Sequence, residues 1–317
     1  MAENTVKKIA TRESYGNSLK ELAEEFPNLV VLDADLAAAT KTGIFRKAYP
    51  DRHIDCGIAE SNMMGVAAGL SLVGKIPFVS SFAMFAAGRA FEQVRNSIGY
   101  PHLNVKIGAT HAGITVGEDG ATHQCNEDIA LMRTIPGMVV MCPSDDVEAR
   151  AAVRAALEYE GPVYIRFGRA AVPVINDHPG YHFEIGKGTV VREGKDVTIV
   201  ATGICVDSAL GAAKMLEEEG ISAEVVNICT IKPLDEEIII NSAKKTGKVV
   251  TVEEHSVIGG LGSAVCEVVA DKAPCCVARI GYQDIFLQCG DDNVLFHRYG
   301  MDAEGIATKA ASLVQTR

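Results

Sequence analysis

The chain has 317 residues, 48% of them hydrophobic, and a formal charge of −11. A chain of this length can bury two full cores, and its acidic balance argues against nucleic acid or an anionic membrane as a general partner. The N-terminus carries no apolar signal core, and no apolar segment approaches the ~20 residues needed to span a bilayer. The nine cysteines are scattered, without the paired spacing of a zinc site. We therefore expect a cytoplasmic protein with reduced thiols and no membrane association.

Apolar runs alternate with amphipathic segments along the first half of the chain. The runs predict strands at 29–32, 76–80, 104–109, 138–142 and 163–167, and the segments between them predict helices at 13–26, 84–99, 126–134 and 145–159. Strands that alternate with helices in this way are typical of a parallel sheet, whose ligands bind beyond the carboxyl ends of the strands. The residues that follow each strand are therefore the candidates for function.

The segment from Asp55 to Leu70 predicts a helix of small and apolar residues with one carboxylate, Glu60, in its first turn. Such a helix is expected to be buried on most sides and to pack closely on another backbone. No Lys or Arg follows Glu60 before Lys75. Two interpretations stay open, because Glu60 could offset the helix dipole or could be a buried, unpaired carboxylate suited to proton chemistry.

The loop after the strand at 104–109 contains His111 and His123, with Asp119 between them. Its Gly117-Glu-Asp-Gly120 sequence predicts tight turns. A separation of twelve residues between the two histidines is not a ligand spacing typical of metal sites, so hydrogen bonding is favoured and no metal ligands are expected in this chain.

A stretch from Val172 to Glu193 is rich in Pro, Gly and His and predicts a linker. We divide the chain into a first domain at 1–175, a linker at 176–193 and a second domain at 194–317. Strands at 197–201, 223–228, 248–253 and 276–280 alternate with further helices in the second domain, so the fold class is two parallel-sheet α/β domains. The turn Gly259-Gly-Leu-Gly262 does not fit a dinucleotide fingerprint and is expected only to join a strand to a helix. The second domain is expected to be structural or dimer-forming.

Several motifs, in this order, resemble transketolase, a thiamine diphosphate enzyme. They are Ile58-Ala-Glu60-Ser-Asn-Met, Ser81-Phe82-Ala-Met-Phe85, Thr110-His111-Ala-Gly, Gly117-Glu-Asp-Gly120-Ala-Thr-His123-Gln, Arg133-Thr-Ile-Pro-Gly-Met138, Thr230-Ile-Lys-Pro-Leu234-Asp and Val252-Glu-Glu-His255. The resemblance covers almost the whole chain but only the second half of a usual transketolase, namely a thiamine-pyrimidine-binding domain followed by the C-terminal domain. The Gly-Asp-Gly and Asn of that family's diphosphate-binding domain have no counterpart here. The resemblance therefore implies an N-terminal partner subunit and an α2β2 assembly.

The resemblance implies cofactor-binding roles for four residues. Glu60 matches the glutamate that hydrogen-bonds N1′ of the cofactor's aminopyrimidine, and its apolar helix would supply the dry pocket that this contact needs. Phe82 and Phe85 match the aromatic residues that wall the pyrimidine ring. Asp35 would lie near the cofactor at the end of the first strand.

The resemblance also implies a set of substrate-binding residues. His111, Asp119 and His123 would face the sugar and steer proton transfer, so the catalytic set is Glu60, His111 and His123. Arg12 and Arg169 match the arginines that clamp the terminal phosphate of the sugar by bidentate bonds. Ala39 departs from the family, because a serine that contacts phosphate usually stands there.

These roles imply the transfer of a two-carbon ketol unit from a ketose phosphate to an aldose phosphate. Thiamine diphosphate and Mg²⁺ would be held mainly by the partner subunit. The alternatives are the β subunit of a 2-oxo acid dehydrogenase, a deoxyxylulose-phosphate-synthase-like protein, or a non-catalytic partner subunit. The first normally has His-Ser-Gln where this chain has Gly117-Glu-Asp-Gly, and the intact Glu60 argues against the last.

Overall fold

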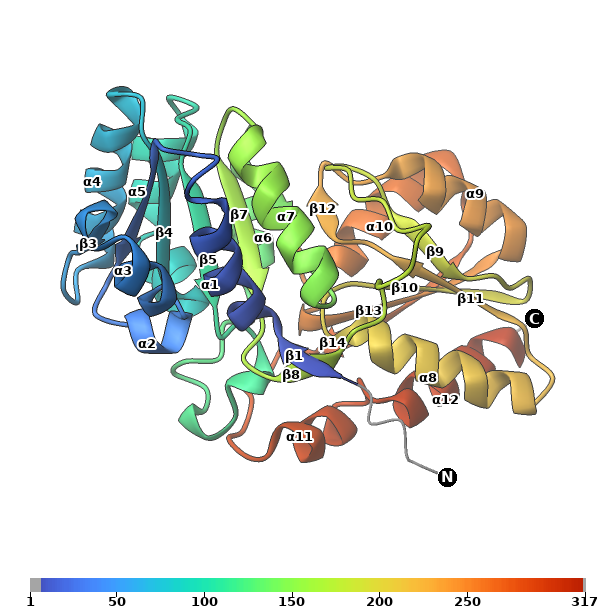
Figure 1. Cartoon of the computed structure of the whole chain (residues 1–317). Coiled ribbons are helices and arrows are strands. Elements are labelled where there is room, and N and C mark those ends of the chain that lie inside the picture. Colours follow the sequence, from blue (N-terminus) through green and yellow to red (C-terminus); the bar gives the residue numbers. More distant parts are fainter. Residues whose placement is uncertain (1–6, 316–317) are drawn as a thin grey trace.

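Two large β-sheets lie side by side in the computed structural model, which describes residues 7–315, and helices cover both faces of each large sheet (Figure 1). The first sheet has seven strands in the order β12 (Thr230–Lys232), β6 (Val139–Met141), β7 (Val163–Phe167), β5 (Lys106–Thr110), β4 (Ile76–Phe82), β2 (Leu29–Asp33) and β3 (His53–Asp55). All neighbouring strands are parallel except β12 and β6. The carboxyl ends of β2, β4, β5 and β7 therefore share one edge.

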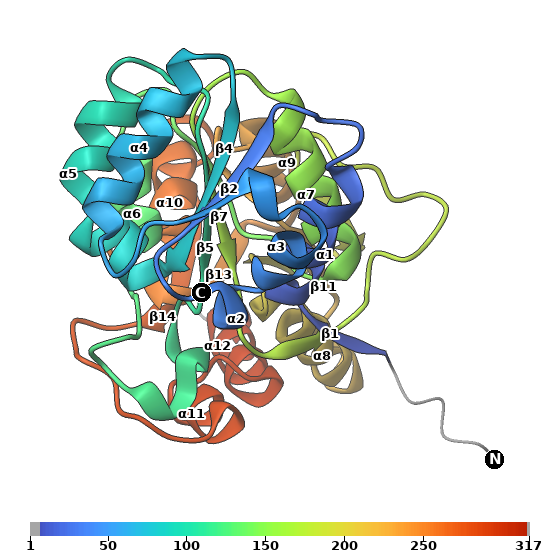
Figure 2. The ribbon, with the colours of Figure 1, turned by 60° about the vertical axis from the view of Figure 1, so that its left-hand side comes forward.

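Helices of the first domain divide between the two faces of this sheet (Figure 2). One face is covered by α1 (Thr11–Leu22), α3 (Gly43–Ala48) and α7 (Asp146–Glu158), and the other by α4 (Glu60–Leu72), the π-helical turns η2 (Met84–Arg89) and η3 (Val94–Gly99), α5 (Phe91–Gln93) and α6 (Asp128–Arg133). The central strands are fully buried between these layers, as expected for a parallel sheet. Short connecting elements are α2 (Ala37–Thr40), η1 (Pro50–Arg52) and η4 (Ile114–Asp119), and β1 (Lys8–Ala10) pairs with β8 (Ala171–Pro173).

The second sheet has five strands in the order β14 (Cys276–Tyr282), β13 (Lys248–Ser256), β10 (Val197–Ala201), β11 (Ala223–Asn227) and β9 (Thr189–Arg192). On its faces lie α8 (Cys205–Glu218) and α12 (Ala303–Gln315) on one side, and α9 (Glu236–Thr246) and α10 (Leu261–Lys272) on the other (Figure 1). The remaining helix, α11 (Asp292–Arg298), packs against η4 of the first domain (Figure 2).

Several local expectations from the sequence differ from the structure. Within the expected linker, β9 forms the antiparallel edge of the second sheet. The strand β12 leaves the second domain and joins the first sheet, so the sheets are not purely parallel. The expected helix at 84–99 is two π-helical turns around a short α-helix. The domain ranges proposed from the sequence also include 1–6 and 316–317, which lie outside the described residues.

The helix α4 is less buried than its composition predicts. Met63, Met64 and Ala67 are buried against the sheet, but Leu72 is 73% exposed and Val73, just after the helix, is also 73% exposed. Apolar periodicity shows that a surface is suited to burial, but it does not show which chain covers it. This apolar face is therefore uncovered by the described residues of the single chain.

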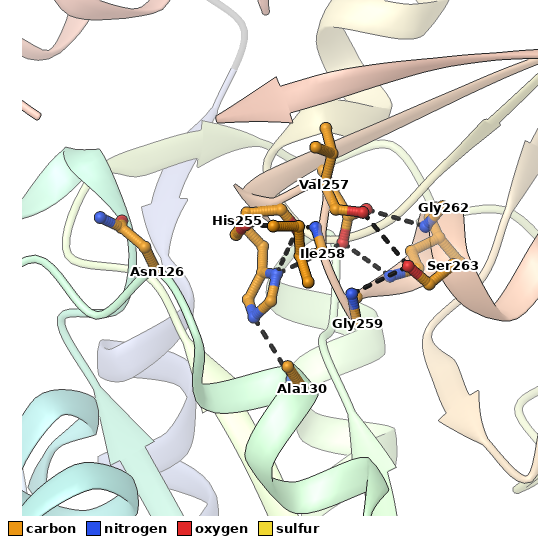
Figure 3. Close-up of polar contacts among 12 residues, drawn as sticks. Asn126, Ala130, His255, Val257, Ile258, Gly259, Gly262 and Ser263 are labelled. Carbon is orange, nitrogen blue, oxygen red and sulfur yellow. Dashed lines mark hydrogen bonds and ion pairs between the residues drawn. The ribbon is translucent and has the colours of Figure 1, made fainter. Parts of the chain in front are cut away.

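The glycine-rich turn before α10 is held by side chains of its own domain. Both carboxylate oxygens of Glu253 accept backbone N–H groups, from Leu261 at 2.6 Å and Gly262 at 2.8 Å. In the same turn, the Ser263 hydroxyl accepts from Gly259 N and donates to the Val257 carbonyl (Figure 3). A carboxylate already lies at the helix N-terminus, where a phosphate would otherwise bind. The turn joins a strand to a helix, as expected.

All nine cysteines are free thiols, in keeping with the expectation of reduced side chains. Among residues 7–315, no helix has both the length and the apolar character that a membrane span requires.

A buried cation joins the two domains. Arg166 on β7 is 4% exposed; its Nε donates to Asp128 at 2.9 Å, and its Nη2 donates to the carbonyl of Glu254 on β13 at 2.7 Å. Tyr164 also donates to the Asp128 carboxylate, at 2.8 Å. Each charge in this group is hydrogen-bonded, so removal of one partner would leave another charge buried and unpaired.

We expect Asp128→Asn to lower the free energy of unfolding by about 3 kcal/mol, because Arg166 would lose its buried counter-charge. Urea denaturation followed by circular dichroism measures this change. The matched control is Glu267→Gln, since Glu267 pairs with Arg133 at 2.7 Å but is 65% exposed. The control should change stability by less than about 0.5 kcal/mol. Equal losses in the two variants would contradict a special role for the buried pair.

Candidate active site

Residues predicted to be functional gather where the strands of the first sheet end. Phe82 is the last residue of β4, His111 follows β5 directly, and Arg169 comes two residues after β7. Glu60 is the first residue of α4, which covers this sheet. The edge-of-sheet rule therefore brings together segments that are far apart in the sequence.

Glu60 is a buried carboxylate, 2% exposed, and it has a partner that the sequence did not predict. The Nη1 atom of Arg89 donates to both of its oxygens, at 3.1 and 3.0 Å. The guanidinium of Arg89 also lies over the ring of Phe85, 4.4 Å from the ring centroid. Of the two interpretations that the sequence left open, the unpaired carboxylate is wrong for this chain, because Arg89 reaches Glu60 from a helical turn 29 residues further along.

Four rings pack around the predicted cofactor wall. The rings of Phe82 and Phe85 stack at a centroid distance of 6.0 Å, and the His111 ring stacks on Phe82 at 4.0 Å. The His123 ring meets Phe85 edge-on at 5.5 Å. A cavity of about 600 Å³ opens beside Phe85 and Arg89. The structure thus places both histidines beside both phenylalanines.

The hydrogen bonds of His111 define its tautomer. Its Nε2 lies 2.9 Å from Nη1 of Arg12, which can only donate, so Nε2 is the acceptor. Its Nδ1 then carries the proton and donates to the hydroxyl of Thr110 at 2.8 Å. Burial, and then the charges of Arg12, Arg169 and Lys41, lower the pKa of His111 from 6.5 to about 3. The ring is therefore neutral at physiological pH.

Arg12 and Arg169 place two guanidinium groups near His111. Burial and then the charge of Arg169 lower the pKa of Arg12 below its ordinary value. The Nε of Arg12 is buried and has no hydrogen-bond partner among the described residues. Arg169 donates from Nε to the carbonyl of Thr115 at 3.0 Å, and its Nη2 lies 3.8 Å from Asp292 on α11. This arrangement suits an anion with several oxygens.

The loop with the two histidines is held by the second domain. Glu254 on β13 accepts from Thr115 N at 2.7 Å, and Tyr282 on β14 accepts from Ile114 N at 3.0 Å. At Gly117, whose φ is +76°, a Cβ would lie 2.7 Å from Arg169 and 2.9 Å from Asp292. The second domain therefore contributes directly to the site and is more than a structural or dimer-forming unit.

Two predicted residues stand apart from these contacts. Asp119 is exposed at the end of η4 and, within residues 7–315, has no hydrogen bond to the cluster. Asp35 is exposed after β2, with a φ of +60°, and its backbone N–H donates to Asp55 at 3.1 Å. The predicted roles of these two residues stay predictions, as do the roles of the residues in the cluster.

The residues of the cluster fit one part of a cofactor. A buried carboxylate beside two stacked phenylalanines suits a planar ring that carries a nitrogen, and so suits an aminopyrimidine. His111, Asp119 and His123 do not form a metal-binding group in the described part of the chain. The one group of possible ligands found there is His297, Asp302 and Glu304, in which His297 is already hydrogen-bonded to Asp302 at 2.7 Å.

Sequence reasoning missed three residues of this site. Arg89 pairs with Glu60, the charge of Lys41 acts on His111, and Glu254 contacts the histidine loop from the second domain. No motif predicted these interactions. One signal was present for Arg89, since it lies four residues after Phe85 on a helical segment and such residues share a face.

Comparison with known proteins identifies the family. The family models for the transketolase pyrimidine-binding domain and the transketolase C-terminal domain match residues 7–174 and 186–306. A transketolase C-terminal section from Methanocaldococcus jannaschii is 52% identical over 300 residues, and the match covers 94% of each chain. A 6-deoxy-6-sulfo-D-fructose transketolase subunit from Clostridium sp. is 45% identical over 306 residues, which is 96% of this chain and 95% of that protein.

A solved structure agrees with these relatives. A chain described as split-gene transketolase, inactive β4 tetramer, is 55% identical, with a TM-score of 0.88 and coverage of 98% of this chain and 100% of that chain. These matches confirm the family resemblance and the two α/β domains that the sequence predicted. The chain belongs to the transketolase family and corresponds to its C-terminal section, a pyrimidine-binding domain followed by a C-terminal domain.

Proposed function

We propose that this chain is the C-terminal subunit of a thiamine diphosphate-dependent transketolase that acts on sugar phosphates together with an N-terminal subunit. The observation that carries the proposal is Glu60, a buried carboxylate at an aromatic wall of Phe82 and Phe85. The bound cofactor would supply the nucleophile that accepts and releases a two-carbon ketol unit. The ligands of the diphosphate and of Mg²⁺ are assigned to the partner subunit.

Each residue of the cluster has a role in this proposal. Glu60 would hydrogen-bond a ring nitrogen of the cofactor and hold a proton there, in a pocket from which Phe82 and Phe85 would exclude water. The unprotonated Nε2 of His111 accepts a hydrogen bond from a sugar hydroxyl once Arg12 turns toward the anion of the substrate. His123 bonds the sugar carbonyl at the edge of the wall. The roles of Asp35 near the cofactor and of Asp119 at a sugar hydroxyl rest on the family resemblance alone.

Arg89 must move for this site to work. It covers the face of Phe85 and both oxygens of Glu60, which are the two surfaces that an aminopyrimidine would occupy. In the chain alone, Arg89 neutralises a buried charge that the cofactor ring would otherwise contact. Its side chain is 50% exposed, so it can swing into solvent.

The surface next to Glu60 supports a role for other subunits. Ile58 is 75% exposed, and the space above Gly65 and Gly69 on α4 is open. An apolar face of this kind is typical of a subunit interface. The β4 tetramer of the split-gene relative supports self-association, and its description as inactive supports dependence on another chain.

The proposal is tested by mixing the chain with an N-terminal subunit, thiamine diphosphate and Mg²⁺, and by assaying ketol transfer from xylulose 5-phosphate to ribose 5-phosphate. We expect ketol transfer in the complete mixture and no transfer when either subunit is omitted. If pyruvate served as the donor instead of the ketose phosphate, with glyceraldehyde 3-phosphate as the acceptor, the deoxyxylulose-phosphate-synthase-like alternative would be favoured.

Glu60→Gln should lower kcat by about 10²- to 10⁴-fold, because an amide cannot exchange a proton with the cofactor ring. Steady-state kinetics of the two-subunit mixture measure the loss. Glu92→Gln is the matched control, since Glu92 is also a helical glutamate of this region but is exposed and bonded to Gln93. Full activity of the Glu60→Gln variant would contradict the proposed mechanism.

In the chain alone, Arg89→Met should lower the free energy of unfolding by about 1–2 kcal/mol, because Glu60 would be left buried without its partner. The loss should shrink by about 1 kcal/mol when Glu60→Gln is already present. Urea denaturation of both single variants and the double variant gives this coupling. Arg95→Met, at an exposed position, is the control. Additive effects would show that the pair is not coupled.

His111 should stay neutral, with its proton on Nδ1, down to about pH 4, and Arg12→Met should raise its pKa because a neighbouring charge is removed. NMR of ring-labelled histidine reads both the tautomer and the pKa. The unfolded chain takes up this proton more readily than the folded chain, so the free energy of unfolding should fall as the pH drops below 6.5. Titration of His111 near pH 6.5 would contradict this arrangement.

A further inference from the structure

Lys41 lies next to the predicted anion clamp, although no motif points to it. It is the residue after α2, and its Nζ forms an ion pair at 3.2 Å with Glu13, the neighbour of Arg12 on α1. Its charge, like those of Arg12 and Arg169, acts on His111. The charges of three cations from three separate segments therefore contribute to the lowered pKa of His111.

The backbone around Lys41 is built to hold it there. Its φ is +70°, a left-handed conformation that a lysine rarely adopts without support. The residues on both sides, Thr40 and Thr42, donate their hydroxyls to the same oxygen of buried Asp33, at 3.0 and 2.7 Å. A Cβ on Gly16 of α1 would lie 2.5 Å from the carbonyl oxygen of Lys41, so only glycine allows this close approach.

The same segment also touches Arg12. The carbonyl of Ala39 accepts from Arg12 Nη1 at 3.0 Å, which ties the turn to the guanidinium. Ala39 itself has no side-chain donor. The Nε of Arg12 has no partner among the described residues, and the only described ion pair of Lys41 is with half-exposed Glu13. An anion that entered here would find an unused donor and a cation held only by a weak surface pair.

We propose that Lys41 is the third cation of the site that binds the terminal oxyanion of the substrate, where it supplies the contact that Ala39 cannot make. This inference rests on the proposed function. On binding, Lys41 exchanges Glu13 for an oxygen of the anion, while Arg12 and Arg169 hold the other oxygens. The chemistry recognised is a tetrahedral oxyanion at the end of a sugar, either a phosphate ester or a sulfonate. Lys41 thereby determines specificity for charged sugars.

The first test uses the chain alone, with inorganic phosphate as the probe and the NMR signals of the His111 ring as the readout. Phosphate should shift these signals in a saturable way, and Lys41→Ala should weaken the apparent affinity about tenfold. The matched control is Lys47→Ala, which removes an equal charge from an exposed position on α3, in the same basic groove as Lys41. Equal affinities in Lys41→Ala and the wild type would overturn the proposal.

The second test uses the two-subunit mixture and compares acceptor sugars. Lys41→Ala should lower the preference in kcat/KM for a phosphorylated over an unphosphorylated aldose about tenfold, and Lys47→Ala should leave this ratio as it is. A sulfonated sugar serves as a third acceptor and shows whether the site prefers the doubly charged anion. If Lys41→Ala left this ratio unchanged and ketol transfer stayed intact, the role proposed for Lys41 would be refuted, but the proposed function would not. If no sugar reacted at all, the proposed function would fail, and the phosphate titration would still decide whether Lys41 binds an oxyanion.

Discussion

The site depends on the buried contact of Arg166 with Asp128 and Glu254. Arg166 donates to the backbone carbonyl of Glu254, and the side chain of Glu254 accepts from Thr115. The carbonyl of Thr115 in turn accepts from Arg169, so a chain of polar contacts runs from the domain boundary to the anion clamp. Each member is buried or partly buried, where hydrogen bonds are strong and unpaired groups are costly. The second domain is thus needed to shape the histidine loop of the first.

The other constraint is the buried carboxylate of Glu60 at the first turn of α4. A carboxylate buried among apolar residues needs a partner, and in this chain Arg89 takes that place. The apolar face of α4 next to it is left exposed, although the same helix buries its other side against the sheet. Both features have one physical reading. Under the proposed function, the cofactor and other subunits would cover both surfaces, and in this chain the Arg89 guanidinium pairs with the buried carboxylate in their place.

The sequence predicts the sheets and the residues at their edges because both follow from local patterns. Phe82 and His111 stand at strand ends, so the rule for parallel sheets was enough to group them, whereas Arg169 was assigned from the family resemblance. The pairing of Glu60 with Arg89, and of Thr115 with Glu254, could not be predicted, because the partners are 29 and 139 residues apart and no period relates them. β12 was missed for a similar reason. Its three residues are too few for a pattern, and only the packing of the two domains brings it beside β6.

The acidic net charge of the chain does not conflict with the proposed binding of anionic sugars at this edge. The formal charge of −11 is spread over the whole surface, and salt screens exposed charges beyond about 8–10 Å. Near His111 the local charge is positive. Burial, and then the charges of Arg12, Arg169 and Lys41, lower the pKa of this histidine. The exposed carboxylates would therefore do little to repel an oxyanion at this edge, whereas the partly buried guanidinium of Arg12 is poorly screened and would attract it. The proposed selectivity for a charged sugar end would then follow from three local cations and not from the net charge of the chain.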